Sequence, residues 1–516
     1  MRDGQGSHPE HPHVAWREEG SLFDKSRAGR IGVQLPPVGV DERPIEELLP
    51  DELRRAPVEG MPELSEVDVI RHFTRVSRRN YSIDLGLYPL GSCTMKHNPR
   101  IHEELARLPG FAQAHPLQPV STVQGSLALM WALEQQLVEL TGMRRVGLAP
   151  AAGAHGEFAG MLMVRRALEQ RGEARRYVLI PDSAHGTNPA SAHFAGYEVR
   201  QLKSTDRGTL DVDDLAATMS EDVAALMLTV PNTLGVFEDR ILDIARIVHD
   251  KGGFLYCDGA NFNAFVGKAR PGDMGCDVLH LNLHKTFTTP HGGGGPGAGP
   301  VAVSEELVPY LPVPTVEKGS AGFYLDHDRP HSIGRIRAFH GQFGMLVRAL
   351  AYILSMGGEG LAAVAEGAVL NANYLRKRLE GTYHLPFKTP SLHEVVFTDK
   401  KQRPHGVTTL DIAKRLLDYG FHPPTVYFPL IVSGAMMIEP TETEGKEELD
   451  AFVDAMQQIA REAEEAPELL QAAPYTTPVR RCDETRAARH PVLRWTPEGD
   501  PPATRPGIRG QGSGKK

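Results

Sequence analysis

The sequence predicts an α/β protein built on a mostly parallel sheet, and three observations support this. Short apolar runs alternate with helical patterns through the middle of the chain. Several runs are apolar throughout, as expected for strands that helices cover on both faces. Charged or small polar residues follow several of these runs, at the strand ends where α/β sheets bind ligands.

The elements are expected in the following order. Apolar residues recur at helical spacing over 126–140. The expected strands cover 146–150, 177–181, 224–230, 254–258, 278–283 and 299–303, and the helices that accompany them run through 161–168, 191–194 and 241–249. A further helix near 350–356 should lead out of this unit.

A chain of 516 residues is too long for one simple core, so more than one domain is expected. The expected parts are an extended arm over 1–60, a segment with an active-site loop over 61–125, a large domain over 126–350, a smaller α+β domain over 351–475, and an extension over 476–516 whose Gly-, Pro-, Arg- and Lys-rich end is disordered. No internal repeat is visible.

The composition is that of an ordinary soluble globular protein. Hydrophobic residues make up 41% and charged residues 23% of the chain, and the net charge is −9. An acidic chain is a poor candidate for nucleic-acid binding. No apolar run approaches the roughly 20 residues of a membrane span, and the first 30 residues carry several acidic side chains, which disfavours a targeting peptide. We therefore expect a cytoplasmic protein with neither nucleic acid nor membrane as a partner.

The four cysteines lie at positions 93, 257, 276 and 482 and form no CxxC pair. Cys257 falls inside an apolar run, where a free thiol packs as a small hydrophobe. This arrangement predicts a reducing compartment and no structural disulfide.

Two segments have the composition of ligand-binding turns. Residues 151–157 (AAGAHGE) stand between a predicted strand and a predicted helix, where small residues and a helix N-terminus can hold a phosphate. A tight turn without a ligand is an equally simple interpretation. In 183–189 (SAHGTNP), His185 could stack on a cofactor ring, or Thr187 or Asn188 could cap a helix before Pro189.

Asp258 and Lys285 are the strongest candidates for catalysis. Asp258 ends the apolar run 254–258, and Lys285 follows the run 278–283, 27 positions later. Pyridoxal 5′-phosphate (PLP) needs a lysine for its Schiff base and a carboxylate for its pyridine nitrogen. Burial would favour the neutral, nucleophilic amine. A magnesium-binding aspartate of a nucleotide hydrolase is the alternative, but the chain has no GxxxxGK[ST] loop.

Three histidines surround this lysine and allow a zinc site as another interpretation. His280, His284 and His291 lack a regular ligand spacing and have no nearby cysteine pair, so a metal is not expected. The order of the motifs favours PLP instead: a glycine turn, a histidine, an aspartate, a lysine, and a second glycine-rich loop over 292–297.

In this order and in its local sequences, the chain closely resembles the PLP-dependent glycine decarboxylase (P-protein) family of the glycine cleavage system. The segments that carry the resemblance are 88–96 (YPLGSCTMK), 153–157 (GAHGE), 183–191 (SAHGTNPAS), 235–238 (GVFE), 258–261 (DGAN), 280–287 (HLNLHKTF), 291–297 (HGGGGPG) and 439–443 (EPTET). The similarity covers roughly 60–495. The length and the lysine motif resemble the separate catalytic subunit, called subunit 2.

The resemblance implies a type I, aspartate-aminotransferase-like fold and a set of roles. Lys285 would form the Schiff base, Asp258 would bind the pyridinium, and His185 would stack on the ring. The phosphate would be held by backbone at Ala154 and His155 and by the side chains of Asn282 and His284, with Ala260 as a further cofactor contact. Ser92, Cys93 and Thr94 would line the channel to the site.

The reaction implied is decarboxylation of glycine, with transfer of the aminomethyl group to the lipoyl arm of the H-protein. The implied partner is glycine dehydrogenase subunit 1, in an α2β2 assembly. Two alternatives stay open: another type I PLP enzyme, such as a different amino-acid decarboxylase, and a catalytically silent subunit of the same complex. The silent subunit predicts the loss of Lys285 or Asp258, and both are present.

Overall fold

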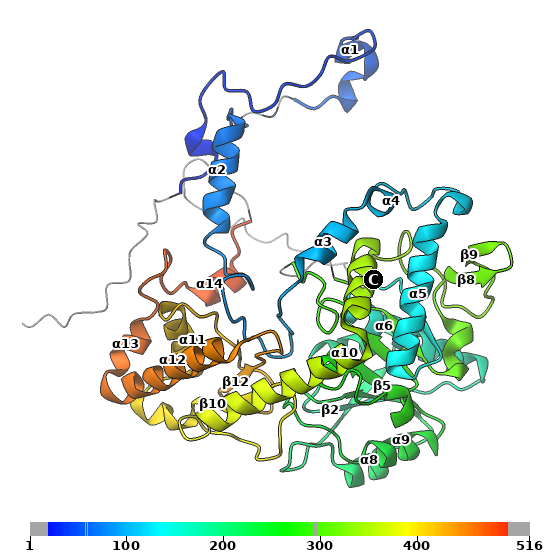
Figure 1. The fold of residues 1–516 in the computed structure, drawn as a ribbon, viewed down its shortest axis with the longest axis vertical. Helices are drawn as coiled ribbons and strands as arrows, with labels where there is room; N and C mark the ends of the chain where they lie inside the picture. Colours follow the sequence, from blue (N-terminus) through cyan, green and yellow to red (C-terminus); the bar gives the residue numbers. More distant parts are fainter. Residues whose placement is uncertain (1–18, 57, 59, 293–296, 494–516) are drawn as a thin grey trace, which may run out of the picture.

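The computed structural model describes residues 19–56, 58, 60–292 and 297–493. A seven-stranded sheet with the order β1-β7-β6-β5-β4-β2-β3 forms the centre of the larger part (Figure 1). Its strands are β1 (Arg145–Gly147), β2 (Tyr177–Pro181), β3 (Glu198–Leu202), β4 (Val223–Thr229), β5 (Phe254–Gly259), β6 (Val278–Leu281) and β7 (Val301–Val303). β3, β2, β4, β5 and β6 pair in parallel, and β7 joins both β6 and β1 antiparallel. The predicted mostly parallel sheet is confirmed.

Helices cover both faces of this sheet because its strands are apolar on both sides. On one face, alternate residues such as Leu226 and Leu255 pack with α5 (Gln124–Thr141), α8 (Val212–Thr218) and α9 (Ile241–His249). On the other face, Met227 and Tyr256 pack with α6 (Gly153–Gln170) and α7 (Thr187–Phe194). Because successive side chains of a strand point to opposite faces of the sheet, the same strands contribute to two separate cores, one on each face.

A long helix, α10 (Phe343–Leu379), connects the larger part to a smaller one (Figure 1). It bends at Gly357, whose φ is 63°, and its far half packs on a three-stranded antiparallel sheet with the order β10-β12-β11. The remaining elements of this part are β10 (Val395–Thr398), β11 (Thr425–Val426), β12 (Ala435–Ile438), α11 (Thr409–Asp418), α12 (Lys446–Glu465) and α13 (Pro467–Ala472). Leu375, Phe397 and Phe452 lie in its core.

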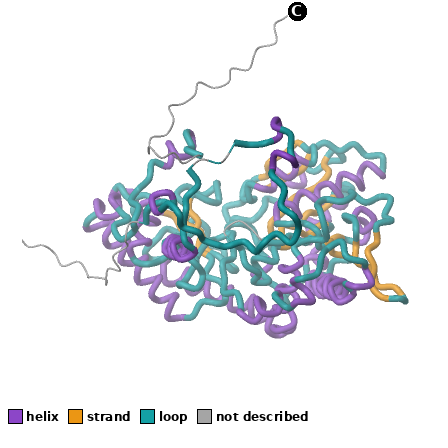
Figure 2. Tube along the Cα trace, turned by 90° about the horizontal axis from the view of Figure 1, so that it is seen from above, coloured by secondary structure: helices purple, strands orange, loops and turns teal. Residues whose placement is uncertain are grey.

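The N-terminal segment stands away from these two parts in Figure 1, and in Figure 2, which shows the molecule from above, it lies in front of them. It contains α1 (Ile45–Leu48) and α2 (Glu66–Ser77), and α3 (Arg100–Ala106) and α4 (Pro109–Ala112) lead back to the larger part. The short α14 (Glu484–Arg489) follows the smaller part, and a β8–β9 hairpin (Thr315–Gly319 and Gly322–Asp326) lies beside α5. The predicted disordered C-terminal end and residues 293–296 of the second glycine-rich loop lie outside the described residues.

One helix of the described part, α10, is long and apolar enough to cross a membrane by length and composition. No apolar stretch approaching the length of a membrane span is expected from the sequence, and α10 corrects that expectation. The stretch was missed because charged residues such as Arg348 and Glu359 interrupt it. α10 contributes Leu346 and Leu350 to the core of the larger part and Leu375 to that of the smaller part, as a helix joining two folded parts must.

The expectation of no structural disulfide is wrong, because Cys257 and Cys276 form one. Cys257 lies on β5, and Cys276 lies in the turn that leads into the neighbouring strand β6, with 6.0 Å between the two Cα atoms. That spacing suits a disulfide. Sequence spacing gave no signal, since the two positions meet only through parallel strand pairing. Cys93 and Cys482 are free.

Candidate active site

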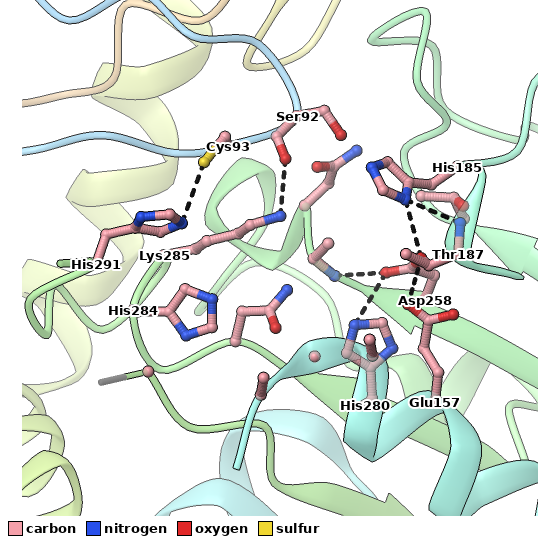
Figure 3. Close-up of a pocket in the computed structure, with 18 of the residues that line it drawn as sticks. Ser92, Cys93, Glu157, His185, Thr187, Asp258, His280, His284, Lys285 and His291 are labelled. Atoms are coloured by element: carbon pink, nitrogen blue, oxygen red, sulfur yellow. Dashed lines mark hydrogen bonds and ion pairs between the residues drawn. The ribbon is translucent and has the colours of Figure 1, made fainter. Parts of the chain in front are cut away.

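Lys285 lies just after β6, in the turn that leaves the sheet at its carboxyl end, and it is buried. Its Nζ donates to the backbone oxygen of Ser92 over 2.8 Å. It lines a cavity of about 550 Å³ that also exposes Asp258 and His185 (Figure 3). The carboxyl ends of β5 and β6 thus bring together two charged residues that the sequence separates, as expected for an α/β crevice.

Asp258 is buried at the end of β5 and is held by several donors. The Ala260 N–H donates to its Oδ1 over 2.9 Å, and the Asn188 amide donates to its Oδ2 over 3.1 Å. His280 Nε2 lies 3.3 Å from Oδ1. Burial acts to raise the pKa of Asp258, but His280 and these hydrogen bonds outweigh it, so the pKa is lowered. Asp258 therefore stays a carboxylate in the cavity.

A second layer of side chains orients this carboxylate. The hydroxyl of Tyr256 lies 2.6 Å from His280 Nδ1, which places the imidazole between Tyr256 and Asp258. Asn188 also donates to Glu157 over 2.9 Å, and the Thr187 hydroxyl donates to Glu157 over 2.7 Å. These contacts engage both oxygens of Asp258 and hold its carboxylate in place.

The side of the cavity opposite Asp258 is shaped to hold an anion. α6 begins at Gly153 with no side chain capping it, so backbone N–H groups at its first turn are free for a ligand. A Cβ on Gly153 would lie 2.3 Å from Asn282 Oδ1, so the backbone closes on this amide. The Ala298 N–H donates to His284 Nδ1 over 3.3 Å. Burial lowers the pKa of His284 to about 3, which leaves a neutral ring with a proton on Nε2.

The remaining predicted cofactor residues divide into two groups. Ala154, Ala260 and His185 line the cavity, and His185 Nδ1 contacts the Thr187 hydroxyl at 2.9 Å. His155 is not among the residues that line it, and its Nδ1 accepts the Ala151 N–H over 3.1 Å. α7 begins at Thr187, without a side-chain cap, so the capping interpretation of Thr187 and Asn188 is wrong.

The segment predicted to line a channel covers one side of the cavity. Ser92 and Cys93 line it, and Cys93 Sγ lies 3.4 Å from His291 Nε2. Burial raises the pKa of Cys93 and lowers that of His291, so both are neutral at neutral pH. Thr94 is the buried end of this segment, and its hydroxyl donates to Glu439 over 2.6 Å; residues 92–94 are called the Ser92–Thr94 wall.

Sequence reasoning missed several polar groups at this site. Asn188 and Glu157 lay inside quoted motifs, but nothing in the sequence indicated that they meet Asp258. Of the possible zinc ligands His280, His284 and His291, the rings of His284 and His291 are in edge-to-face contact, with centroids 5.3 Å apart, but His280 does not join them in one group. In the part of the chain that the structure describes, the groups that could hold a metal ion are Glu157–Asp258–His280 and His393–Glu394–Glu439.

Comparisons with known proteins place this geometry in a family. Residues 364–475 match a family model described as glycine dehydrogenase, C-terminal domain, and residues 156–308 match aminotransferase class-V. A relative from Exiguobacterium sibiricum, named "Probable glycine dehydrogenase (decarboxylating) subunit 2", is 58% identical over 93% of this chain and 98% of its own length. Relatives of the same name from Bacillus licheniformis and Caldanaerobacter subterraneus are 57% and 56% identical, over 93% and 92% of this chain and 99% and 98% of their own lengths.

The chain belongs to the glycine dehydrogenase (decarboxylating) subunit 2 family. Solved structures support the fold. A glycine decarboxylase (P-protein) of the glycine cleavage system, in inhibitor-bound form, has a TM-score of 0.68 at 22% identity, over 80% of this chain and 94% of that one. Glutamate decarboxylase from Lactobacillus brevis has a TM-score of 0.62 at 15% identity, over 80% and 97%. The type I fold predicted from the resemblance is confirmed.

The cofactor of this fold and family is PLP. The residues present fit it on three observations: a buried lysine in the cavity, a carboxylate held ionised at the end of a neighbouring strand, and an uncapped helix N-terminus. A PLP enzyme needs these three partners, for the aldehyde, the pyridinium and the phosphate.

Proposed function

We propose that this chain decarboxylates glycine and passes the aminomethyl group to the lipoyl arm of the H-protein. The observation that carries the proposal is the buried Lys285 amine in one cavity with the ionised Asp258. Membership in the glycine dehydrogenase subunit 2 family supports the reaction class. When bound, PLP supplies the electron sink that loss of a carboxylate requires.

The chain's own residues would do the following. Lys285 would bind the cofactor through its Nζ and release it to the substrate amine. The carbonyl oxygen of Ser92 would then accept a hydrogen bond from the free amine of Lys285, as it does in this structure. Asp258 would keep the pyridine nitrogen protonated, while Asn188 and His280 hold the carboxylate in its ionised form. His185, on the cavity wall, would stack on the ring.

The phosphate would be held at the start of α6. Backbone N–H groups at Ala154 and His155 would donate to it, and the positive end of the helix would favour its charge. Asn282 and the Nε2–H of neutral His284 would add side-chain donors from the turn before Lys285. Ala260, whose N–H is already donated to Asp258, would pack against the cofactor without offering a donor.

Glycine and the lipoyl arm would reach the cavity past Ser92 and Cys93, with Thr94 behind them as support. Since Cys93 and His291 are both neutral, this wall offers the arm a polar but uncharged surface. An uncharged entrance suits the neutral lipoyl group.

Family membership implies a complex with subunit 1, and we propose an α2β2 assembly. Exposed apolar side chains on the N-terminal segment support a partner chain there: Ile31, Val33, Leu35, Val40, Val67, Ile70 and Phe73. The cytoplasmic location stays a proposal. The expected absence of a structural disulfide no longer supports this location, because the chain contains the Cys257–Cys276 disulfide and disulfides are uncommon in a reducing compartment.

The exchange of labelled bicarbonate into the carboxyl group of glycine tests the reaction. The chain, PLP, subunit 1 and lipoylated H-protein together should catalyse exchange, and omission of the H-protein should reduce it strongly. Exchange with another amino acid in place of glycine would favour a different decarboxylase. Absence of exchange with every amino acid, despite bound PLP, would favour a silent subunit.

A further inference from the structure

Three buried ionisable residues lie behind the Ser92–Thr94 wall, outside the cofactor contacts described above. His393 and Glu394 immediately precede β10, and Glu439 immediately follows β12. Since Val395 pairs with Ile438 across these antiparallel strands, Glu394 and Glu439 are held side by side. All three side chains are fully buried.

Each glutamate uses one oxygen to hold the wall and leaves the other without a partner. Glu394 Oε2 accepts the Ser92 N–H over 2.8 Å, and Glu439 Oε1 accepts the Thr94 hydroxyl over 2.6 Å. Among the described residues, Glu394 Oε1, Glu439 Oε2 and both ring nitrogens of His393 have no hydrogen-bond partner, and His393 Nε2 lies 3.9 Å from Glu394 Oε1. One ligand atom from each of the three residues lies within 4.8 Å of the others. Unpartnered buried polar atoms are costly unless a proton or an ion is shared among them.

The charges around the cluster favour a proton. Burial, and then the charge of Glu439, raise the pKa of Glu394 well above its usual value. Burial raises the pKa of Glu439 to about 7, against the opposing effects of Thr94, Lys285 and Lys96, while Glu442 adds to the rise. Burial also lowers the pKa of His393 to about 3, so this ring cannot supply a positive charge. Two carboxylates placed this way cannot both ionise at neutral pH.

The wall that these glutamates hold is strained. Ser92 has a φ of 61°, in the left-handed region that costs a non-glycine residue roughly 1 kcal/mol or more. Its N–H is donated to Glu394 and its oxygen accepts from Lys285, so both sides of the strained residue are fixed. Gly91 packs so closely that a Cβ there would lie 2.0 Å from Met437 Cγ. The segment therefore depends on the smaller part of the molecule for its shape.

We propose that Glu394 and Glu439 form a carboxylic acid pair that retains one proton between the two carboxyl groups at neutral pH, and that this pair positions the Ser92–Thr94 wall against Lys285. Both residues are positioning residues, since they act through Ser92 and Thr94. No bond is made or broken except that to the shared proton, which passes to solvent as the pH rises. The proposal rests on the proposed function only for the role of Lys285.

Infrared spectroscopy of the purified full chain tests the shared proton directly. The difference spectrum between wild type and the E394Q/E439Q double variant should contain a protonated carboxyl stretch at about pH 7. In E439Q the remaining carboxyl group, Glu394, should ionise at a lower pH than the pair does, because no second negative charge opposes it. E238Q is the matched control: Glu238 is buried elsewhere, its pKa is also raised to about 7 by burial, and both its oxygens accept hydrogen bonds.

The thiol of Cys93 reports on the wall without the cofactor or activity. Cys93 is partly buried between the two anchored residues, and exposed Cys482 serves as the internal reference. Relative to Cys482, alkylation of Cys93 should be roughly tenfold or more faster in E394A and E439A, which leave a buried donor unpaired. E394Q and E439Q keep an acceptor and should stay close to the wild-type rate. In the wild type, the ratio should rise as the pH passes the point at which the infrared band disappears.

Three results would overturn the proposal. The first is the absence of a protonated carboxyl band from this pair at neutral pH. The second is a stoichiometric divalent ion in the purified protein whose chelation speeds alkylation of Cys93, since an ion would then explain the unpartnered atoms. The third is an unchanged Cys93 rate in both alanine variants. A wild-type chain that fails in the exchange assay would instead count against the proposed function, because neither readout here needs glycine.

Discussion

The two walls of the cavity are built on opposite principles. At the sheet, Asp258 is ionised and both its oxygens accept hydrogen bonds, from Ala260 and Asn188, although Asn188 Oδ1 itself has no partner. Behind the Ser92–Thr94 wall, Glu394 and Glu439 keep unpartnered oxygens and raised pKa values. Burial acts on all three carboxyl groups, so His280 and the hydrogen-bond donors around Asp258 decide which of them carries charge.

This difference assigns the walls different tasks. At the sheet wall, Asp258 already has its hydrogen-bond partners, so this wall is preorganised, as a site for a cofactor must be. The opposite wall depends on a proton and on contacts from the smaller part, so it can respond to pH or to a partner. Lys285 lies between them, with its backbone after β6 and its amine on Ser92.

Replacement of Lys285 by alanine should have the largest effect. Loss of the amine removes the covalent attachment of the cofactor, and the exchange of bicarbonate into glycine should fall by more than about 10⁴-fold. Lys268→Ala is the control, because Lys268 is exposed and pairs with Glu366 on the surface. An exchange rate of K285A within tenfold of the wild-type rate would contradict the role assigned to Lys285 between the two walls.

Asp258→Asn should lower exchange by roughly 10²-fold or more, because it removes a preorganised charge from the rigid wall. The visible absorbance of bound cofactor should change with it. Asp182→Asn is the matched control: Asp182 follows strand β2 of the same sheet, bonds Ser204 and does not line the cavity. Equal losses in the two variants would show that the carboxylate of Asp258 acts only through stability.

Lys96→Met tests how firmly the smaller part holds the wall. The buried Lys96 amine donates to Glu442 over 2.6 Å and to Asn263 over 2.9 Å. Burial opposes its charge, but Glu442 outweighs this and raises the pKa of Lys96. Removal should cost about 3–5 kcal/mol of unfolding free energy by leaving a carboxylate unpaired. K268M should cost about 1 kcal/mol or less, and equal costs in denaturant titrations would contradict this account.

The pH dependence of stability should show the smallest effect. The pKa of Glu439 is raised from 4.5 to about 7, so the folded chain binds this proton more tightly than the unfolded chain. The stabilisation is fully present below pH 4.5 and is lost as the pH rises through about 7. E439Q should flatten the fall in unfolding free energy over this range, measured in denaturant. A slope identical to that of wild type would mean that Glu439 is ionised throughout.

The rigid wall could be predicted from the sequence, and the adjustable one could not. Asp258 and Lys285 follow apolar runs that form buried parallel strands, so local pattern places them at one edge of the sheet. β3 was not predicted, because this edge strand is mostly exposed and reads as polar. Glu394 and Ser92 stand 302 positions apart and meet only through packing of the smaller part on the larger. No local pattern carries such a contact.

The most direct test of the central claim is to locate the attachment of PLP. The chain, alone and mixed with subunit 1, should be incubated with PLP, reduced with borohydride, digested and mapped by mass spectrometry. The account predicts a stable pyridoxyl modification on Lys285, in the chain alone or only in the mixture. Modification of other lysines with Lys285 unmodified in both samples would contradict it.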